Sequence, residues 1–223
     1  MDWSVVIFTL WVAALAVAVS LPFALALAWL LARKRWPGKA IVEACISAPL
    51  VLPPVATGFA LLLVMGRQSF VGSIFEEIFG ADIVFTWRAV AVAMAVMSFP
   101  LVVRTSRVGF ESVDTHCEDA ARTFGAGPWS VFWQVTLPLA RRGVLGGVVL
   151  GFARALGEFG ATIVFAGNIP ARTTTVPLAI YSDIILGDNA AAFQLIAVAL
   201  VIALAAVAVG DRLARPVPGT AAG

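Results

Sequence analysis

Three long stretches without a charged residue constrain the fold of this chain more than any other feature. No Asp, Glu, Lys or Arg occurs within residues 3–32, 44–66 or 189–210. Each stretch is long enough for the helix of about 20 apolar residues that crosses the hydrocarbon core of a bilayer. Charged residues make up only 13% of the chain, whereas a soluble domain carries about 25%. The sequence therefore predicts an all-α, polytopic membrane protein.

The apolar stretches predict a bundle of about five transmembrane spans. The expected spans are residues 5–32, 40–65, 84–103, 143–165 and 190–209. Arg88 shortens the uncharged part of the third span, but it can snorkel to the interface beside Trp87. Pro49, Pro53 and Pro54 are expected to break or kink the second span, which is tolerated only where neighbours satisfy the freed carbonyl groups. We therefore expect the second span to pack inside the bundle or to line a cavity.

The basic residues predict the orientation of this single transmembrane domain, residues 1–223. Most of them fall between the first two spans, between the third and fourth spans, or after the fifth. These are Arg33, Lys34, Arg35, Lys39, Arg104, Arg107, Arg122, Arg141, Arg142, Arg212 and Arg215. The opposite side holds only Arg67, Arg88 and Arg172. Because cytoplasmic loops are enriched in Lys and Arg, the N-terminus is expected outside and the C-terminus in the cytoplasm.

Composition and motif content exclude several function classes. The net charge is only +2, so no nucleic-acid partner is expected. Cys45 and Cys117 lie far apart, and His116 is the single histidine, so neither a disulfide framework nor a metal site is expected. The sequence has no Gly-x-x-x-x-Gly-Lys-Ser/Thr phosphate loop. We therefore expect no catalytic residue, no ATPase site and no cofactor in this chain.

The longest soluble piece is the segment 104–142, between the third and fourth spans. Acidic residues alternate with apolar ones in its first half, which favours short amphipathic helices. Gly125, Gly127 and Pro128 then interrupt the helical pattern, and a second short helix is expected from Trp129, ending before Pro138. A glycine suits the joint because it takes positive φ at little cost. These features alone fit equally an interfacial loop packed on its own bundle and an angled projection beneath the membrane.

The residue pattern of this segment favours the angled projection over the interfacial loop. Residues 118–125, Glu-Asp-Ala-Ala-Arg-Thr-Phe-Gly, and residues 135–138, Val-Thr-Leu-Pro, closely resemble the signature loop of ABC-importer permeases. That signature reads Glu-Ala-Ala, three residues, Gly, nine residues, Ile-x-Leu-Pro. Here Asp119 is an additional residue within the Glu-Ala-Ala element, and Val135 occupies the Ile position. The resemblance implies a type I ABC importer permease fold.

The resemblance also implies that this loop is a coupling element that docks into a groove on a separate ATP-binding subunit. The residues expected to form it are Glu118, Asp119, Ala120, Ala121, Gly125, Leu137 and Pro138. Small alanines permit close approach, and Glu118 can pair with a basic group of the partner, so we expect Glu118 to be exposed in the isolated chain. The implied partners are two ABC ATPase copies that bind ATP and Mg, a second copy of this chain and an extracytoplasmic substrate-binding protein. The implied location is the cytoplasmic (inner) membrane of a bacterium or archaeon.

Other segments of the chain indicate the cargo. Residues 49–54, 65–67, 152–162 and 167–170 resemble the oxyanion branch of these permeases, and residues 174–177 with Tyr181 are most similar to molybdate permeases. Sulfate permeases share much of the pattern, usually with more spans, so sulfate and tungstate remain alternatives to molybdate.

Two charges lie within the expected fourth span. Arg154 and Glu158 are one helical turn apart on one face, and each alone would cost about 2.5–3.5 kcal/mol at a helix centre. As a pair they can neutralise each other, which fits either a packing pair or a pore or gate element. In the second case Arg154 and Thr162 are candidate contacts for an anion, whereas Glu158 would repel one. Gly157, Gly160 and Ala161 are expected to permit close helix packing.

Two different classes of membrane protein are less well supported. A secondary transporter or channel often shows inverted repeats or several charged intramembrane sites, and the sequence shows neither. A non-transporting membrane anchor would not need paired intramembrane charges or a proline-interrupted span.

Overall fold

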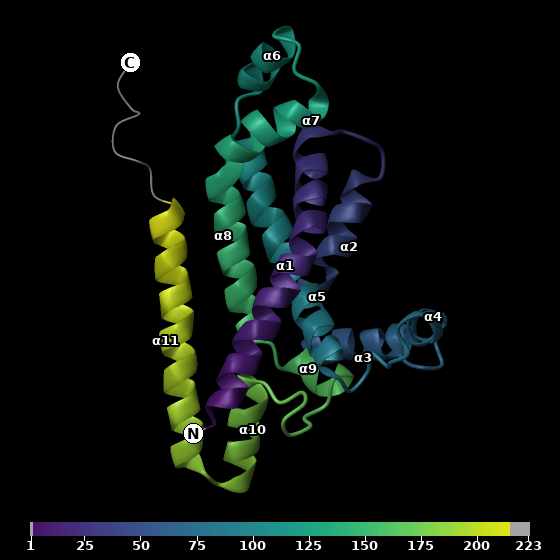
Figure 1. Ribbon diagram of the computed structural model, residues 1–223, viewed down its shortest axis with the longest axis vertical. Helices are drawn as coiled ribbons and strands as arrows, with labels where there is room; N and C mark the ends of the chain where they lie inside the picture. The colour runs from purple at the N-terminus through teal and green to yellow at the C-terminus, as the bar shows by residue number, and fades with distance from the viewer. Residues whose placement is uncertain (1, 215–223) are drawn as a thin grey trace.

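The computed structural model describes residues 2–214, and the regular structure within that range is helical. The elements are α1 Trp3–Arg33, α2 Lys39–Val51, α3 Pro54–Met65, α4 Phe70–Phe79, α5 Trp87–Glu111, α6 Thr115–Thr123, α7 Pro128–Val131, the π-helical turn η1 Phe132–Thr136, α8 Leu137–Leu156, α9 Gly160–Phe165, α10 Val176–Leu186 and α11 Asn189–Ala214 (Figure 1). Four helical segments in this range are long and apolar enough to cross a membrane, or five if α2 and α3 count as one broken span. The predicted all-α bundle of about five spans is confirmed.

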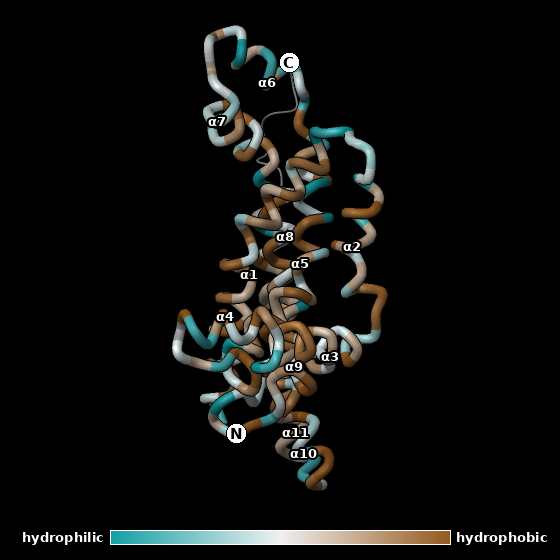
Figure 2. The backbone as a smooth tube through the Cα atoms, turned by 90° about the vertical axis from the view of Figure 1, so that its right-hand side faces the viewer, coloured by the Kyte–Doolittle hydropathy of each residue, from teal (hydrophilic) through white to brown (hydrophobic). Residues whose placement is uncertain are grey.

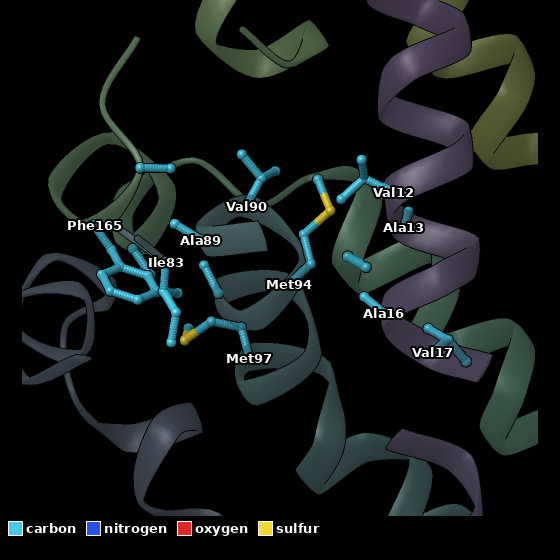
Figure 3. Close-up of a cluster of buried hydrophobic side chains, with 14 residues drawn as sticks. Val12, Ala13, Ala16, Val17, Ile83, Ala89, Val90, Met94, Met97 and Phe165 are labelled. Atoms are coloured by element: carbon cyan, nitrogen blue, oxygen red, sulfur yellow. The ribbon is translucent and has the colours of Figure 1, made fainter. Parts of the chain in front are cut away.

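Three long helices, α1, α5 and α8, form the packed centre of the bundle (Figure 1). In the half nearer the N-terminus, Val12 and Ala16 of α1 pack with Met94 and Met97 of α5, and Phe165 of α9 adds its ring to the cluster (Figure 3). A second buried cluster joins the same three long helices in the half nearer α6. Since lipid tails are as apolar as these side chains, close van der Waals packing holds such helices together within a bilayer.

Glycines bring α5 and α8 unusually close. A Cβ on Gly143 of α8 would lie 2.4 Å from the Cα of Gly109 in α5. Gly147 and Gly151 continue the same face of α8, and a Cβ on each would meet Val102 atoms at 3.0 and 2.4 Å. Small residues four positions apart lie on one helix face and let two backbones approach in a membrane. Side chains at these three positions of α8 would separate the helices.

The second expected span is two helices. α2 ends at Val51 and α3 begins at Pro54, and the two axes are bent by 114°. The predicted break at the prolines is confirmed, because Pro54 occupies the first turn of α3, where no amide donor is needed. The first half of the expected span does not pack inside the bundle, since no residue of α2 is buried in the isolated chain, whereas Thr57 and Gly58 of α3 are buried. α3 turns across the bundle and packs on α9 (Figure 1 and Figure 2).

The third and fourth expected spans also have different limits. α5 runs on to Glu111, beyond the expected end at residue 103. α8 begins at Leu137, six residues before the expected start at residue 143, and ends at Leu156. The segment over residues 160–165 is the separate short helix α9. The segment 104–142 is therefore largely helical, and only residues 112–136 leave the long helices.

Two further helices were not predicted, α4 and α10. Ser69 caps the start of α4 by accepting a hydrogen bond from the Gly72 amide at 3.0 Å. Arg67 hydrogen-bonds Glu76 across the α3–α4 turn, which lowers the pKa of that carboxyl from its ordinary value. α10 is apolar but too short to span a bilayer. It packs beside α11, which contacts α8 along one side of the bundle (Figure 1).

Candidate functional site

The loop with the signature pattern is a compact helical projection at the end of the bundle opposite the start of α1 (Figure 1). α6 begins where Asp114 accepts a hydrogen bond from the His116 amide at 2.9 Å. It ends before Gly125, whose φ is +86°, a conformation that L side chains rarely adopt. α7 then starts at Pro128. The prediction of two short helices joined at a glycine is confirmed.

The second short helix does not stop before Pro138, as was expected. α7 passes into the π-helical turn η1, and the amide of Leu137 donates to the carbonyl of Phe132, five residues back. Pro138 then sits in the first turn of α8, and it lacks the amide hydrogen that would donate to the preceding turn of the helical segment. α7, η1 and α8 therefore form one continuous helical segment, so the projection is joined directly to a core helix.

Glu118 is buried, which contradicts the expected exposure. Its side chain faces the bundle, with the residue only 4% exposed. Arg33 Nη2, at the end of α1, donates to Glu118 Oε1 at 2.7 Å, and Thr136 Oγ1 donates to the same oxygen at 2.8 Å. Arg122 Nη2 lies 3.8 Å from Oε2. The exposure prediction failed because the arginine that binds this carboxylate comes from the same chain, 85 residues away.

The other residues of the signature divide by position. Asp119, Ala120 and Gly125 are exposed on the projection, and Ala121 is half-buried. Asp119 Oδ1 accepts a hydrogen bond from Arg122 Nη1 at 2.6 Å. Leu137 and Pro138 lie at the start of α8 instead, one half-buried and the other exposed. The structure thus groups Asp119 to Gly125 on one outward surface and separates Leu137 and Pro138 from it.

Three exposed aromatic residues on the projection were missed from the sequence. Phe124 is 91% exposed beside the joint, Trp129 of α7 is 73% exposed and Trp133 of η1 is 50% exposed. The two tryptophan rings contact each other edge to face, with centroids 5.6 Å apart. Large exposed aromatic side chains are typical of protein–protein contact sites. The signal available in the sequence was Phe124 itself, an aromatic residue next to a turn glycine in a polar segment.

The second pair of site residues marks a break after α8. Glu158 lies beyond the end of α8 and is 1% exposed. Arg154 Nη1 lies 2.8 Å from Glu158 Oε2, and Glu158 Oε1 accepts a hydrogen bond from the Ala161 amide at 2.7 Å. The pairing is as expected, but Glu158 is not in a continuous helix. Its carboxylate both neutralises Arg154 and satisfies an orphan amide in the first turn of α9.

The break is packed tightly against α3. A Cβ on Gly160 would lie 2.7 Å from Pro54 Cβ, and a Cβ on Gly58 would lie 2.6 Å from the Ala161 carbonyl oxygen. The expected close packing at Gly160 and Ala161 is confirmed. At Gly157 it was wrong, because a Cβ there would meet nothing nearer than the Arg154 carbonyl oxygen at 4.0 Å.

Two buried hydroxyl groups lie on the helices that meet at this contact. The oxygens of Thr57 in α3 and Thr162 in α9 have no hydrogen-bond partner among the described residues. Arg154 keeps 26% of its side chain exposed, whereas its partner Glu158 is enclosed. The hydroxyl groups of Thr57 and Thr162 are therefore hydrogen-bond donors at the break that have no acceptor among the described residues.

Comparison with known proteins identifies the family. The family described as the binding-protein-dependent transport system inner membrane component matches residues 20–217. The chain belongs to this family. This transport component is 47% identical over 215 residues to a protein named molybdenum transport system permease protein ModB from Escherichia coli K12, with 96% of this chain and 94% of that protein covered.

Two further comparisons concern a relative named for another substrate and a solved structure. A protein named as a probable sulfate transport system permease from Chlorokybus atmophyticus is 39% identical over 178 residues, covering 80% of this chain but 62% of that protein. The solved structure of an inward-facing methionine ABC transporter, MetNI, aligns with a TM-score of 0.70, 18% identity and coverage of 96% of this chain and 98% of the other. At that identity the likeness establishes the fold, which is that of a type I importer permease.

Proposed function

We propose that this chain is the membrane permease subunit of an ATP-driven importer that carries molybdate. The observation that supports the substrate is the near full-length similarity to the Escherichia coli molybdenum permease. The relative named for sulfate is less similar and extends well beyond the region that this chain matches. Molybdate is therefore favoured over sulfate, and the family membership favours import through a multi-subunit transporter over a secondary transporter or channel.

The proposed complex holds two copies of this chain and two copies of a separate ABC ATPase, with a binding protein on the outer side. Apolar surface supports the second copy. α2 has no buried residue, and Phe59 and Leu63 of α3 are 54% and 62% exposed. A hollow of about 580 Å³ between α1, α8, α10 and α11 is lined almost wholly by apolar side chains. Such a lining does not suit a dianion, so this hollow is not proposed as the pathway, which is placed instead between the two copies.

In the proposed orientation the N-terminus is outside and the α6 projection lies in the cytoplasm of a bacterial or archaeal cell. Asp119, Ala120, Ala121 and Gly125 then form, with Phe124, the surface that docks on the ATPase. ATP and Mg bind to that partner, and this chain contributes no catalytic residue. Arg154 and Thr162, at the break between α8 and α9, are the proposed transient contacts for the anion, since Arg154 keeps 26% of its side chain exposed beside its bond to Glu158 and the Thr162 hydroxyl has no partner among the described residues.

Uptake of labelled molybdate tests the proposal. Cells without their own molybdate importer would produce this chain with its cognate ATPase and binding protein, and an ATPase variant unable to hydrolyse ATP is the matched control. We expect uptake in the first case alone, reduced by excess unlabelled molybdate far more than by sulfate. Equal competition by sulfate would overturn the substrate, and uptake with the inactive ATPase would overturn the mechanism. Native mass measurement of the complex checks the copy number, and one permease chain per two ATPases would refute the homodimer.

A further inference from the structure

The buried carboxylate of Glu118 is placed to act within the permease itself. Its Oε1 accepts hydrogen bonds from both Arg33 and Thr136, and 5% of its side chain is exposed. A partner that docks on the outer surface of α6 therefore finds this carboxylate enclosed and already paired. We propose that Glu118 is a positioning residue that fastens α6 to α1 and to η1, and that it does not bind the ATPase. This inference rests on the proposed coupling role of α6.

Arg33 holds the projection at two points. Its Nη2 donates to Glu118 Oε1 at 2.7 Å and also to the carbonyl oxygen of Val113 at 3.1 Å. Val113 precedes α6, and Glu118 lies in its middle. Arg33 itself lies in the last turn of α1, which crosses the whole bundle. One guanidinium group thus ties both the entry and the centre of α6 to the end of a core helix.

Thr136 provides the second attachment. It is the last residue of η1, is 1% exposed and donates its hydroxyl hydrogen to Glu118 at 2.8 Å. α8 begins at the next residue. The π-helical turn contains an extra residue per turn relative to an α-helix, and such turns often occur at functional positions. Through a single carboxylate, α6 is therefore bonded to α1 and to η1, the turn that leads directly into α8.

The remaining charged neighbour sits on the solvent side of this joint. Arg122 Nη2 lies 3.8 Å from Glu118 Oε2, but Arg122 is half exposed and bonds Asp119 at a shorter distance. Arg33 is the closer and more enclosed partner, with 14% of its side chain exposed. A buried carboxylate that loses such a partner is left with an uncompensated charge, whereas replacement of both groups removes the charge altogether.

That asymmetry gives opposite predictions for an internal joint and for a contact with the ATPase. If Glu118 pairs with Arg33, then Arg33→Met should be more harmful than Glu118→Gln, because it leaves the carboxylate unpaired in the interior. Adding Glu118→Gln to Arg33→Met should then restore most of the lost function, and the bond from Arg33 to the Val113 carbonyl accounts for the remaining difference from Glu118→Gln alone. If Glu118 instead bound the ATPase, the second substitution would remove a further contact, and the double variant would be worse than either single variant.

The experiment uses the full complex in proteoliposomes and measures ATPase retention and molybdate transported per ATP hydrolysed. For Glu118→Gln we expect normal retention and about a tenfold fall in transport per ATP, the factor that a charge-assisted hydrogen bond represents. Glu111→Gln is the matched control, since Glu111 is an exposed carboxylate paired with Arg107 at the end of α5, and both readings should stay at the wild-type level.

The outcomes separate this inference from the proposed function. Rescue of Arg33→Met by Glu118→Gln, with retention unchanged, supports the joint. A double variant that is worse than both single variants, or loss of the ATPase from Glu118→Gln, overturns it. If the wild-type complex consumes ATP but imports no molybdate, the proposed function fails first. If Arg33→Met yields no folded complex, recovery of assembly in the double variant serves as the same test, and absence of that recovery counts against the joint.

Discussion

Replacing Gly143 with alanine should force α5 and α8 apart where their backbones nearly touch. The added Cβ would lie 2.4 Å from the Cα of Gly109 and 2.8 Å from its amide nitrogen. Both are backbone atoms, so no side-chain rotation relieves the overlap, and the helices must separate by roughly 1 Å to regain ordinary van der Waals distance. Overpacking of this kind costs about 1–3 kcal/mol.

Gly146→Ala is the matched control in the same helix. Its Cβ would meet only Thr105 Cγ2, at 3.6 Å, which is an ordinary contact. Both substitutions gain about 1 kcal/mol of helix propensity, so the difference between them isolates the α5–α8 contact. An expected difference of about 2 kcal/mol corresponds to a melting temperature lower by about 4–8 °C for a chain of this size. Circular dichroism of the detergent-purified protein measures it.

Equal melting temperatures for the two variants would show that α5 and α8 do not meet at Gly143. The packing of the core helices described above would then be wrong.

Three further predictions concern the projection and the break. Phe124→Ala should weaken retention of the ATPase about tenfold at an unchanged melting temperature, because the side chain is 91% exposed; unchanged retention in a pull-down titration would remove Phe124 from the docking surface. Gly125→Val should insert normally yet uncouple uptake from ATP hydrolysis, because a φ of +86° strains a β-branched residue by about 1–2 kcal/mol; normal coupled uptake would refute this. Arg154→Met should lower the yield of folded protein, because unpairing the buried Glu158 carboxylate costs about 3–5 kcal/mol. Glu158→Gln keeps an acceptor for the Ala161 amide and should lower the yield of folded protein less than Arg154→Met does. Size-exclusion chromatography measures that yield for both variants.

Features that depend only on residues close together in the sequence were predictable. Uncharged stretches located the membrane helices, because each needs only its own length and composition. Pro53 and Pro54 predicted the break in the second span, and Gly125 predicted the joint in the projection, since both are limits on local backbone geometry. The direction of α3 after the break was not predictable, because it is set by contact with α9 about 100 residues later in the chain.

The residues of the candidate site were predicted from the sequence, but their burial and their bonding partners were not. The signature located Glu118, yet its burial depends on Arg33, which is 85 residues away and carries no local mark of that pairing. Arg154 and Glu158 were paired correctly from their four-residue spacing, and the ion pair forms although α8 ends between them. The end itself was missed, since Gly157 alone does not predict a break within an apolar run.

α8 joins the two candidate sites mechanically. At its start, Thr136 bonds Glu118 of the projection, and at its end Arg154 bonds Glu158 at the break. Between these points the glycine face of α8 lies against α5 at backbone distance, so little space is left for the helix to bend or slide independently. We therefore expect displacement of α6 to move α8 as a unit. α8 ends at the break after Leu156, where α9 is packed on α3, and that contact is where the pathway is expected to open.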